Sequence, residues 1–116
     1  MWGVNINSDT MSYRQYTPFS TNSVVLGPFG VFLKGMKCRY DETLLLKEDY
    51  DMFIQNCNEY RGVLRLNKYH YVCRQSEQKG GCAMYRSMER EKEQFEKLRN
   101  KWGNDIVKLD KSNKGR

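Results

Sequence analysis

Two adjacent acids, Glu48 and Asp49, are the residues of this chain whose type and position best suit chemistry. They precede a stretch with helical periodicity, so one of them is expected at a helix N-terminus, where free backbone N–H groups and the helix dipole favour an ionised carboxylate. A carboxylate held there could act as a general base or bind a substrate hydroxyl. The same position suits an ordinary helix cap, and spacing alone favours the cap.

The helix after these acids is predicted from apolar residues spaced three or four apart. Gly62 marks its expected end, because glycine is common just past a helix C-terminus. The apolar stripe consists of Tyr50, Phe53, Ile54, Cys57 and Tyr60.

The chain has four cysteines and no Cys-x-x-Cys pair. No secretion signal is present, so a disulfide framework is not expected. A zinc site could be imagined, but its ligand spacing matches no common zinc motif, and buried free thiols are expected instead. The ligands of such a site would be Cys57, His70, Cys73 and Cys82.

Composition places the chain among small folded domains. Its 116 residues make at most one domain, and 39% hydrophobic residues are enough for a core. No apolar run approaches the ~18 residues of a membrane span, and the N-terminus has no signal-peptide pattern. A cytoplasmic protein without a membrane partner is therefore expected.

Positive charge is concentrated in the second half. Residues 1–58 hold 5 Lys/Arg and 6 Asp/Glu, a net charge of −1, whereas residues 59–116 hold 15 and 8, a net charge of +7. Such a half suits a partner that carries phosphate, but also an ordinary solvated face. Aromatic and basic residues interleave here as in nucleic-acid-binding surfaces, and the candidate contacts are Arg65, Lys68, Tyr69, Tyr71 and Arg86.

The elements that position these residues are predicted to be a mixture of helices and strands. Alternation or β-rich composition predicts strands over 2–7, 24–26, 31–33, 63–73 and 106–109. Residues 24–33 are expected to form a hairpin or a bent strand, and 63–73 one long strand or a hairpin. A second helix is expected from the N-cap Ser87 to Trp102, with Met88, Phe95, Leu98 and Trp102 as its apolar stripe and Gly103 at its end. The fold class is α/β, with a mixed sheet and two main helices.

An ordered series of motifs resembles a known family. The series begins with Trp-Gly-Val-Asn-Ile-Asn at 2–7 and Tyr-Arg-Gln-Tyr-Thr-Pro-Phe-Ser at 13–20, and continues with Leu-Lys-Glu-Asp-Tyr-Asp at 46–51 and Tyr-Arg-Gly-Val-Leu-Arg-Leu-Asn-Lys-Tyr-His-Tyr at 60–71. Lys-Gly-Gly-Cys at 79–82 and Lys-Trp-Gly at 101–103 complete it. Over about residues 1–109 the chain resembles the C-terminal, acceptor-side half of GT-A-fold glycosyltransferases, and most closely the phage and prophage TET-associated glycosyltransferases.

The resemblance implies a transfer of sugar from a nucleotide sugar to modified bases in DNA. It places Glu48 and Asp49 on the acceptor side, with Asp49 favoured as base or hydroxyl ligand. It also implies a divalent metal, Mn or Mg, to which His70 is the candidate ligand. A lone histidine between two tyrosines in a strand is more often structural.

The chain departs from this family in one respect. GT-A enzymes hold the nucleotide sugar through an N-terminal βαβ half with an Asp-x-Asp metal motif, and no residues here supply that half. Asp49-Tyr50-Asp51 has the spacing but lies within the predicted helix, so it is interpreted as a chance match. Residues 1–109 are therefore expected to be a partial domain that works with a second polypeptide, and 110–116 a disordered basic tail. The alternative is a small basic protein without enzymatic activity that binds nucleic acid or another protein.

Overall fold

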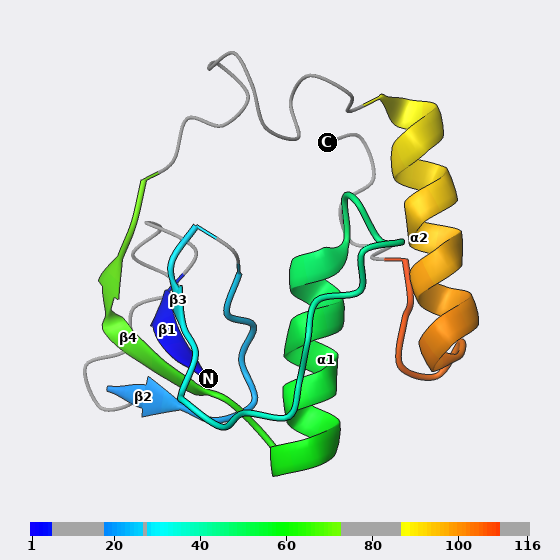
Figure 1. The fold of residues 1–116 in the computed structure, drawn as a ribbon. Coiled ribbons are helices and arrows are strands. Elements are labelled where there is room, and N and C mark those ends of the chain that lie inside the picture. Colours follow the sequence, from blue (N-terminus) through cyan, green and yellow to red (C-terminus); the bar gives the residue numbers. More distant parts are fainter. Residues whose placement is uncertain (6–17, 27, 73–86, 110–116) are drawn as a thin grey trace.

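The computed structural model describes residues 1–5, 18–26, 28–72 and 87–109. These residues form a four-stranded mixed sheet and two helices, and the helix α1 lies between the sheet and α2 (Figure 1). The expected α/β class with two main helices is thus confirmed. The predicted tail, the Lys-Gly-Gly-Cys motif at 79–82 and Arg86 lie outside the described residues.

The sheet has the order β2-β4-β1-β3. Its central strands β1 (Trp2–Asn5) and β4 (Leu64–His70) run parallel, while β2 (Phe19–Ser20) pairs with β4 and β3 (Gly30–Val31) with β1, both antiparallel. The pairing of β1 with β4 slips after Val4, so that Asn5 lies opposite His70. Within residues 63–72 the structure therefore has one strand with an irregularity and not a hairpin, and this strand ends at His70.

Helix α1 spans Glu48–Tyr60. Its C-cap is Arg61, which adopts the left-handed conformation (φ 64°), so the helix stop predicted at Gly62 is one residue too late. Gly62 serves a different purpose, because a Cβ atom there would lie 2.4 Å from the carbonyl oxygen of Thr21. This close approach lets the Val63 N–H donate to the same oxygen (2.9 Å) and fixes the path of the chain from α1 into β4.

The burial of α1 differs from the prediction. Tyr50 and Tyr60 of the predicted stripe are exposed, while the most buried residues are Asp51, Met52 and Asn56. The reason is that α1 packs on both sides (Figure 1). Towards the sheet, Met52 joins a cluster with Met36, Cys38 and Met1. On the other side, Ile54 joins a cluster formed with α2.

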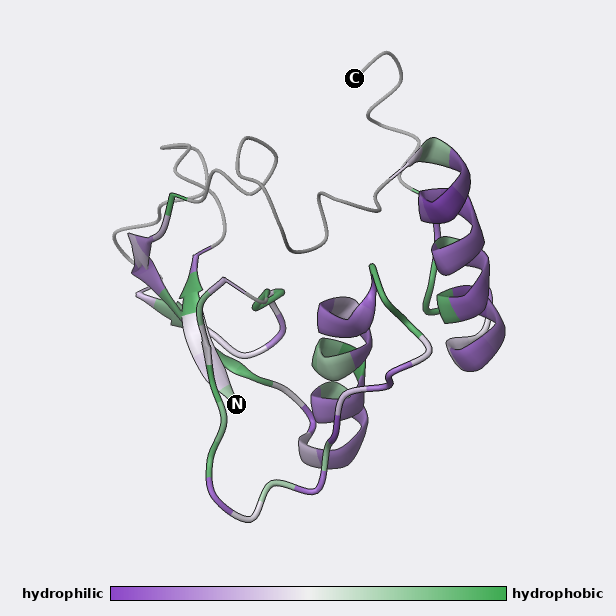
Figure 2. Cartoon of the chain, turned by 45° about the horizontal axis from the view of Figure 1, so that its top comes forward, coloured by the Kyte–Doolittle hydropathy of each residue, from purple (hydrophilic) through white to green (hydrophobic). Residues whose placement is uncertain are grey.

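Helix α2 spans Met88–Trp102 and has the predicted ends. The hydroxyl of Ser87 accepts a hydrogen bond from the Arg90 N–H (3.2 Å), and Gly103 follows with φ 92°. Most of α2 is hydrophilic (Figure 2), and its buried face is narrow. Leu98 packs with Leu44 and Val107, and Phe95 and Trp102 flank them. Met88 is 88% exposed, so its place in the predicted stripe is wrong.

Two predicted strands are not observed. Residues 24–26 have no strand partner, although Val25 is fully buried beneath Gly3, so the predicted hairpin or bent strand over 24–33 is wrong. Residues 104–107 form a turn in which the Val107 N–H donates to the Gly103 carbonyl (3.0 Å), so no edge strand forms at 106–109. In each stretch one valine is buried, Val25 against β1 and Val107 against α2, whereas Ile106 and Leu109 are exposed. Within the described residues, no helix is long and apolar enough to cross a membrane.

Candidate functional site

The predicted acid pair lies in the first turn of α1. The N-cap is Lys47, which makes no side-chain capping bond, so neither Glu48 nor Asp49 is the cap that spacing favoured. Asp49 accepts a hydrogen bond from the Tyr50 N–H at 2.9 Å. Both acids are partly exposed, in the position where the helix dipole stabilises negative charge.

Tyr40 connects this acid pair to a cavity. Burial, followed by the negative charges of Glu48 and Asp49, raises the pKa of the Tyr40 hydroxyl above its ordinary value. The Tyr40 ring makes an edge contact with Phe32, with ring centroids 5.8 Å apart. Both rings line a cavity of about 300 Å³ whose wall is mainly apolar. Tyr40 is therefore the link between the two carboxylates and the cavity, whose lining includes neither Glu48 nor Asp49.

The candidate contacts on β4 divide into two groups. Arg65 is half-buried, donates through Nε to the Asn67 side chain (2.8 Å), and has a pKa lowered by burial. Lys68, Tyr69 and His70 are consecutive and exposed, so they can meet a partner directly. Tyr71, just beyond the strand, is half-buried.

The metal and thiol predictions have different outcomes. Among the described residues, no group of three or more His, Cys, Asp or Glu side chains could hold a metal ion, and His70 belongs to none. A divalent metal therefore stays a prediction from the family resemblance. Cys38 and Cys57 are free thiols, as expected, and burial raises the pKa of each. Cys73 and Cys82 lie outside the described residues.

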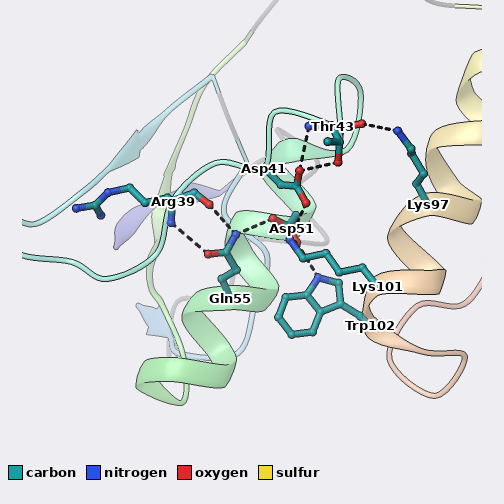
Figure 3. Close-up of polar contacts among 8 residues, drawn as sticks. All are labelled: Arg39, Asp41, Thr43, Asp51, Gln55, Lys97, Lys101 and Trp102. Carbon is teal, nitrogen blue, oxygen red and sulfur yellow. Dashed lines mark hydrogen bonds and ion pairs between the residues drawn. The ribbon is translucent and has the colours of Figure 1, made fainter.

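Among the described residues, the most extensive polar cluster surrounds Asp51, the second acid of the Asp49-Tyr50-Asp51 sequence that was interpreted as a chance match. Its side chain is completely buried. Its Oδ1 accepts from the Trp102 indole N–H (2.7 Å) and pairs with the Lys101 ammonium (2.9 Å), and its Oδ2 accepts from Gln55 (2.6 Å) (Figure 3). A buried carboxylate needs partners of this kind, since an unpaired charge in the interior is very costly.

Lys101 extends the cluster to Asp41. Its ammonium also pairs with the Asp41 carboxylate at 2.9 Å, and Asp41 accepts from the Thr43 N–H and hydroxyl (Figure 3). The bonds from Thr43 and Lys101 hold the pKa of Asp41 well below its usual range. Burial acts to lower the pKa of Lys101, but its hydrogen bonds to Asp41 and Asp51 outweigh burial and raise it.

Gln55 fixes the segment that precedes this cluster. Its side-chain amide accepts from the Arg39 N–H (3.2 Å) and donates to the Arg39 carbonyl (2.7 Å), as a neighbouring strand would. Because the same Nε2 also donates to Asp51, the buried carboxylate is connected through Gln55 to the backbone beside Tyr40. Asp51 thereby helps to position the wall of the Tyr40 cavity.

This cluster was missed because its partners are far apart in the sequence. Asp51 and Trp102 are separated by 51 residues. The signals that were available are the acid inside a predicted helix and the Lys-Trp pair at the end of another. Neither indicates that the two helices meet there.

No protein-family model, no curated protein and no solved structure matches this chain. The resemblance to GT-A glycosyltransferases therefore stays a prediction from the ordered sequence motifs.

Proposed function

We propose that this chain is the acceptor-side portion of a glycosyltransferase that works with a separate polypeptide, which binds the nucleotide sugar. The observation that supports it best is the position of Tyr40, which lines a cavity and also lies in the electric field of Glu48 and Asp49. A carboxylate binds a hydroxyl strongly, and an aromatic ring packs against the flat face of a base or sugar. Both properties are needed to hold an alcohol acceptor.

In the proposed reaction Asp49 acts on the acceptor hydroxyl. Its carboxylate accepts a hydrogen bond from the hydroxyl and takes the proton as the hydroxyl oxygen attacks the anomeric carbon of the donor sugar. A bond forms between that oxygen and that carbon, and the bond from the carbon to the diphosphate breaks. The diphosphate leaves with the electron pair. Glu48 supplies a second negative charge beside the acceptor.

The proposed acceptor is a hydroxylated base in DNA. The exposed side chains of Lys68, Tyr69 and His70 support it, since they combine a cationic group with aromatic rings on one strand. A DNA acceptor also agrees with the net charge of +7 over residues 59–116.

Acceptor binding can be tested on the chain alone, because it needs no sugar donor. The purified chain is titrated with two DNA oligonucleotides of the same sequence, one of which carries hydroxymethylated pyrimidines. We expect tighter binding of the hydroxymethylated DNA. D49N should reduce that preference about tenfold, the worth of a hydrogen bond to a charged group.

The matched control is E93Q, which removes one negative charge from an exposed position of α2. It should keep the full preference for hydroxymethylated DNA. An unchanged preference in D49N, or equal binding of the two oligonucleotides by the unaltered chain, would contradict the proposal.

A second candidate function, DNA or RNA binding without catalysis, is favoured by the same exposed group on β4. It predicts binding that weakens steeply with salt, because each neutralised phosphate releases counterions. K68A should reduce the slope of log K against log salt by about 1, and Y69A should weaken binding to single strands about tenfold through lost stacking. Indifference to hydroxymethylation, together with this salt dependence, would favour this function over sugar transfer.

A further inference from the structure

We infer that a second cavity, between α1, the end of α2 and residues 37–41, binds a neutral, hydroxyl-rich ligand of the size of a monosaccharide unit. The cavity has a volume of about 480 Å³, within the ~300–1,000 Å³ that is usual for small-molecule sites. It contains neither Glu48 nor Asp49 in its lining. The inference therefore does not depend on the proposed transfer reaction.

The charges around this cavity cancel. Three cations line it, and they are matched by two lining acids together with Asp51, which pairs with Lys101 directly behind the wall. The lining cations are Lys37, Arg39 and Lys101, and the lining acids are Asp41 and Glu59. An anionic or a cationic ligand would find no excess of opposite charge here.

Most of these charges are already paired within the protein. Lys37 pairs with Glu59 at 3.4 Å, and Lys101 lies 2.9 Å from both Asp41 and Asp51. The Arg39 guanidinium donates to the carbonyls of Met36 and Cys38 and is directed away from Asp51 and Trp102 (Figure 3). A charged ligand would have to displace an existing ion pair, whereas hydroxyl groups can add hydrogen bonds to paired charges without separating them.

Trp102 supplies a fixed flat surface. Its indole N–H is held by the buried Asp51 carboxylate at 2.7 Å, so the ring has one defined orientation where it lines the cavity. The Lys101 ammonium lies 5.7 Å from the ring centroid. A sugar ring has a flat C–H face that packs on such a surface and hydroxyl edges that need polar partners.

Side chains of α1 supply those polar partners. Asn58 is exposed and lines the cavity, and its amide can donate and accept at once. Gln55 lines the same wall but is already bonded to Arg39 and Asp51, which makes it rigid. The cavity therefore favours a neutral polyol with an apolar face. Its charges are paired, the Trp102 indole is fixed, and the Asn58 amide is exposed to a ligand.

NMR titration of the full chain tests this inference. The Trp102 indole signal is assigned by comparison with W2F, and the probes are glucose, galactose, glycerol and sodium sulfate, added separately. We expect glucose or galactose to shift the Trp102 indole and the Asn58 amide signals in a saturable manner. Glycerol, which lacks a ring face, and sulfate, which is charged, should leave them in place.

Two variants check the assignment. N58A should weaken sugar binding about fivefold, the typical effect of one lost hydrogen bond, while N22A, at an exposed position of the loop after β2, should not change it. D49N should also leave sugar binding unchanged, and N58A should keep the preference for hydroxymethylated DNA. These two results separate a failure of this inference from a failure of the proposed function.

Three results would overturn the inference: no saturable shift with either sugar, equal shifts with glycerol or sulfate, or equal sugar affinity in N58A and the unaltered chain.

Discussion

Asp49 and Asp51 lie two residues apart on α1 and have opposite environments. Asp49 is partly exposed and accepts one hydrogen bond, from the N–H of the next residue. Asp51 is completely buried and bound by Lys101, Trp102 and Gln55. A helix rotates by about 200° over two residues, so the two carboxylates leave it on different sides.

The difference shows which acid is available for chemistry and which maintains the structure. The oxygens of Asp51 are already occupied by donors from α1 and α2, so this carboxylate has little capacity for a substrate. Asp49 keeps acceptor capacity, and its charge acts on Tyr40, which lines the apolar cavity. Substitution should therefore affect folding at one position and binding at the other.

The largest expected effect is that of D51A. Removing the carboxylate leaves the Lys101 ammonium with only Asp41 and the Trp102 N–H without its acceptor, and breaking a buried ion pair costs about 3–5 kcal/mol of the free energy of unfolding. Urea denaturation followed by circular dichroism measures it. A loss below about 1 kcal/mol would mean that Asp51 does not hold the two helices together.

A smaller effect is expected of W102F, which keeps an aromatic ring but removes the indole N–H. A hydrogen bond to a charged group contributes about 1.5–3 kcal/mol, and we expect a loss in that range. The control is Y69F, which removes a hydroxyl from an exposed ring on β4 and should leave the free energy of unfolding unchanged. Equal stability of W102F and Y69F would contradict the assigned role of the indole.

Acid should weaken the cluster through Asp41. The pKa of this carboxyl is lower in the folded chain than the ~3.9 of an unfolded one, so the stability it contributes is present above that value. As pH falls from about 4 towards the lower pKa of the folded chain, protonation of Asp41 removes this contribution to stability. The unaltered chain should therefore lose thermal stability over this range more steeply than D41N, whereas parallel losses in the two chains would refute the role of Asp41.

The smallest effect on folding is expected of D49A. It removes a negative charge from the first turn of α1, an interaction worth about 0.3–1 kcal/mol at an exposed helix N-terminus. Urea denaturation beside D51A gives the direct comparison. A cost as large as that of D51A would show that Asp49, too, is a structural residue.

Local sequence signals predicted where both helices lie and the ends of α2, but not the caps or the buried face of α1. The N-cap Ser87 and the terminal Gly103 define α2, and both act through bonds within a few residues. The strands β2 and β3 were not predicted as they occur, because each has two residues and exists only through its register with β4 or β1. Val25 shows the same limit, since it is buried under Gly3 without belonging to any strand.

The candidate site was predictable only where its parts are neighbours in sequence. Glu48 and Asp49 were identified because the acids precede their own helix. The contribution of Tyr40 depends on how the chain approaches α1, and that of Asp51 on the docking of α2. Both depend on tertiary contacts, which a pattern of neighbouring residues does not predict.

Cys38 and Arg39 line both the Tyr40 cavity and the cavity beside Trp102. A ligand that displaces these two residues in one cavity therefore changes the shape of the other cavity. By thermodynamic linkage this coupling is mutual: a ligand in either cavity would change the affinity of the other cavity for its own ligand by the same factor.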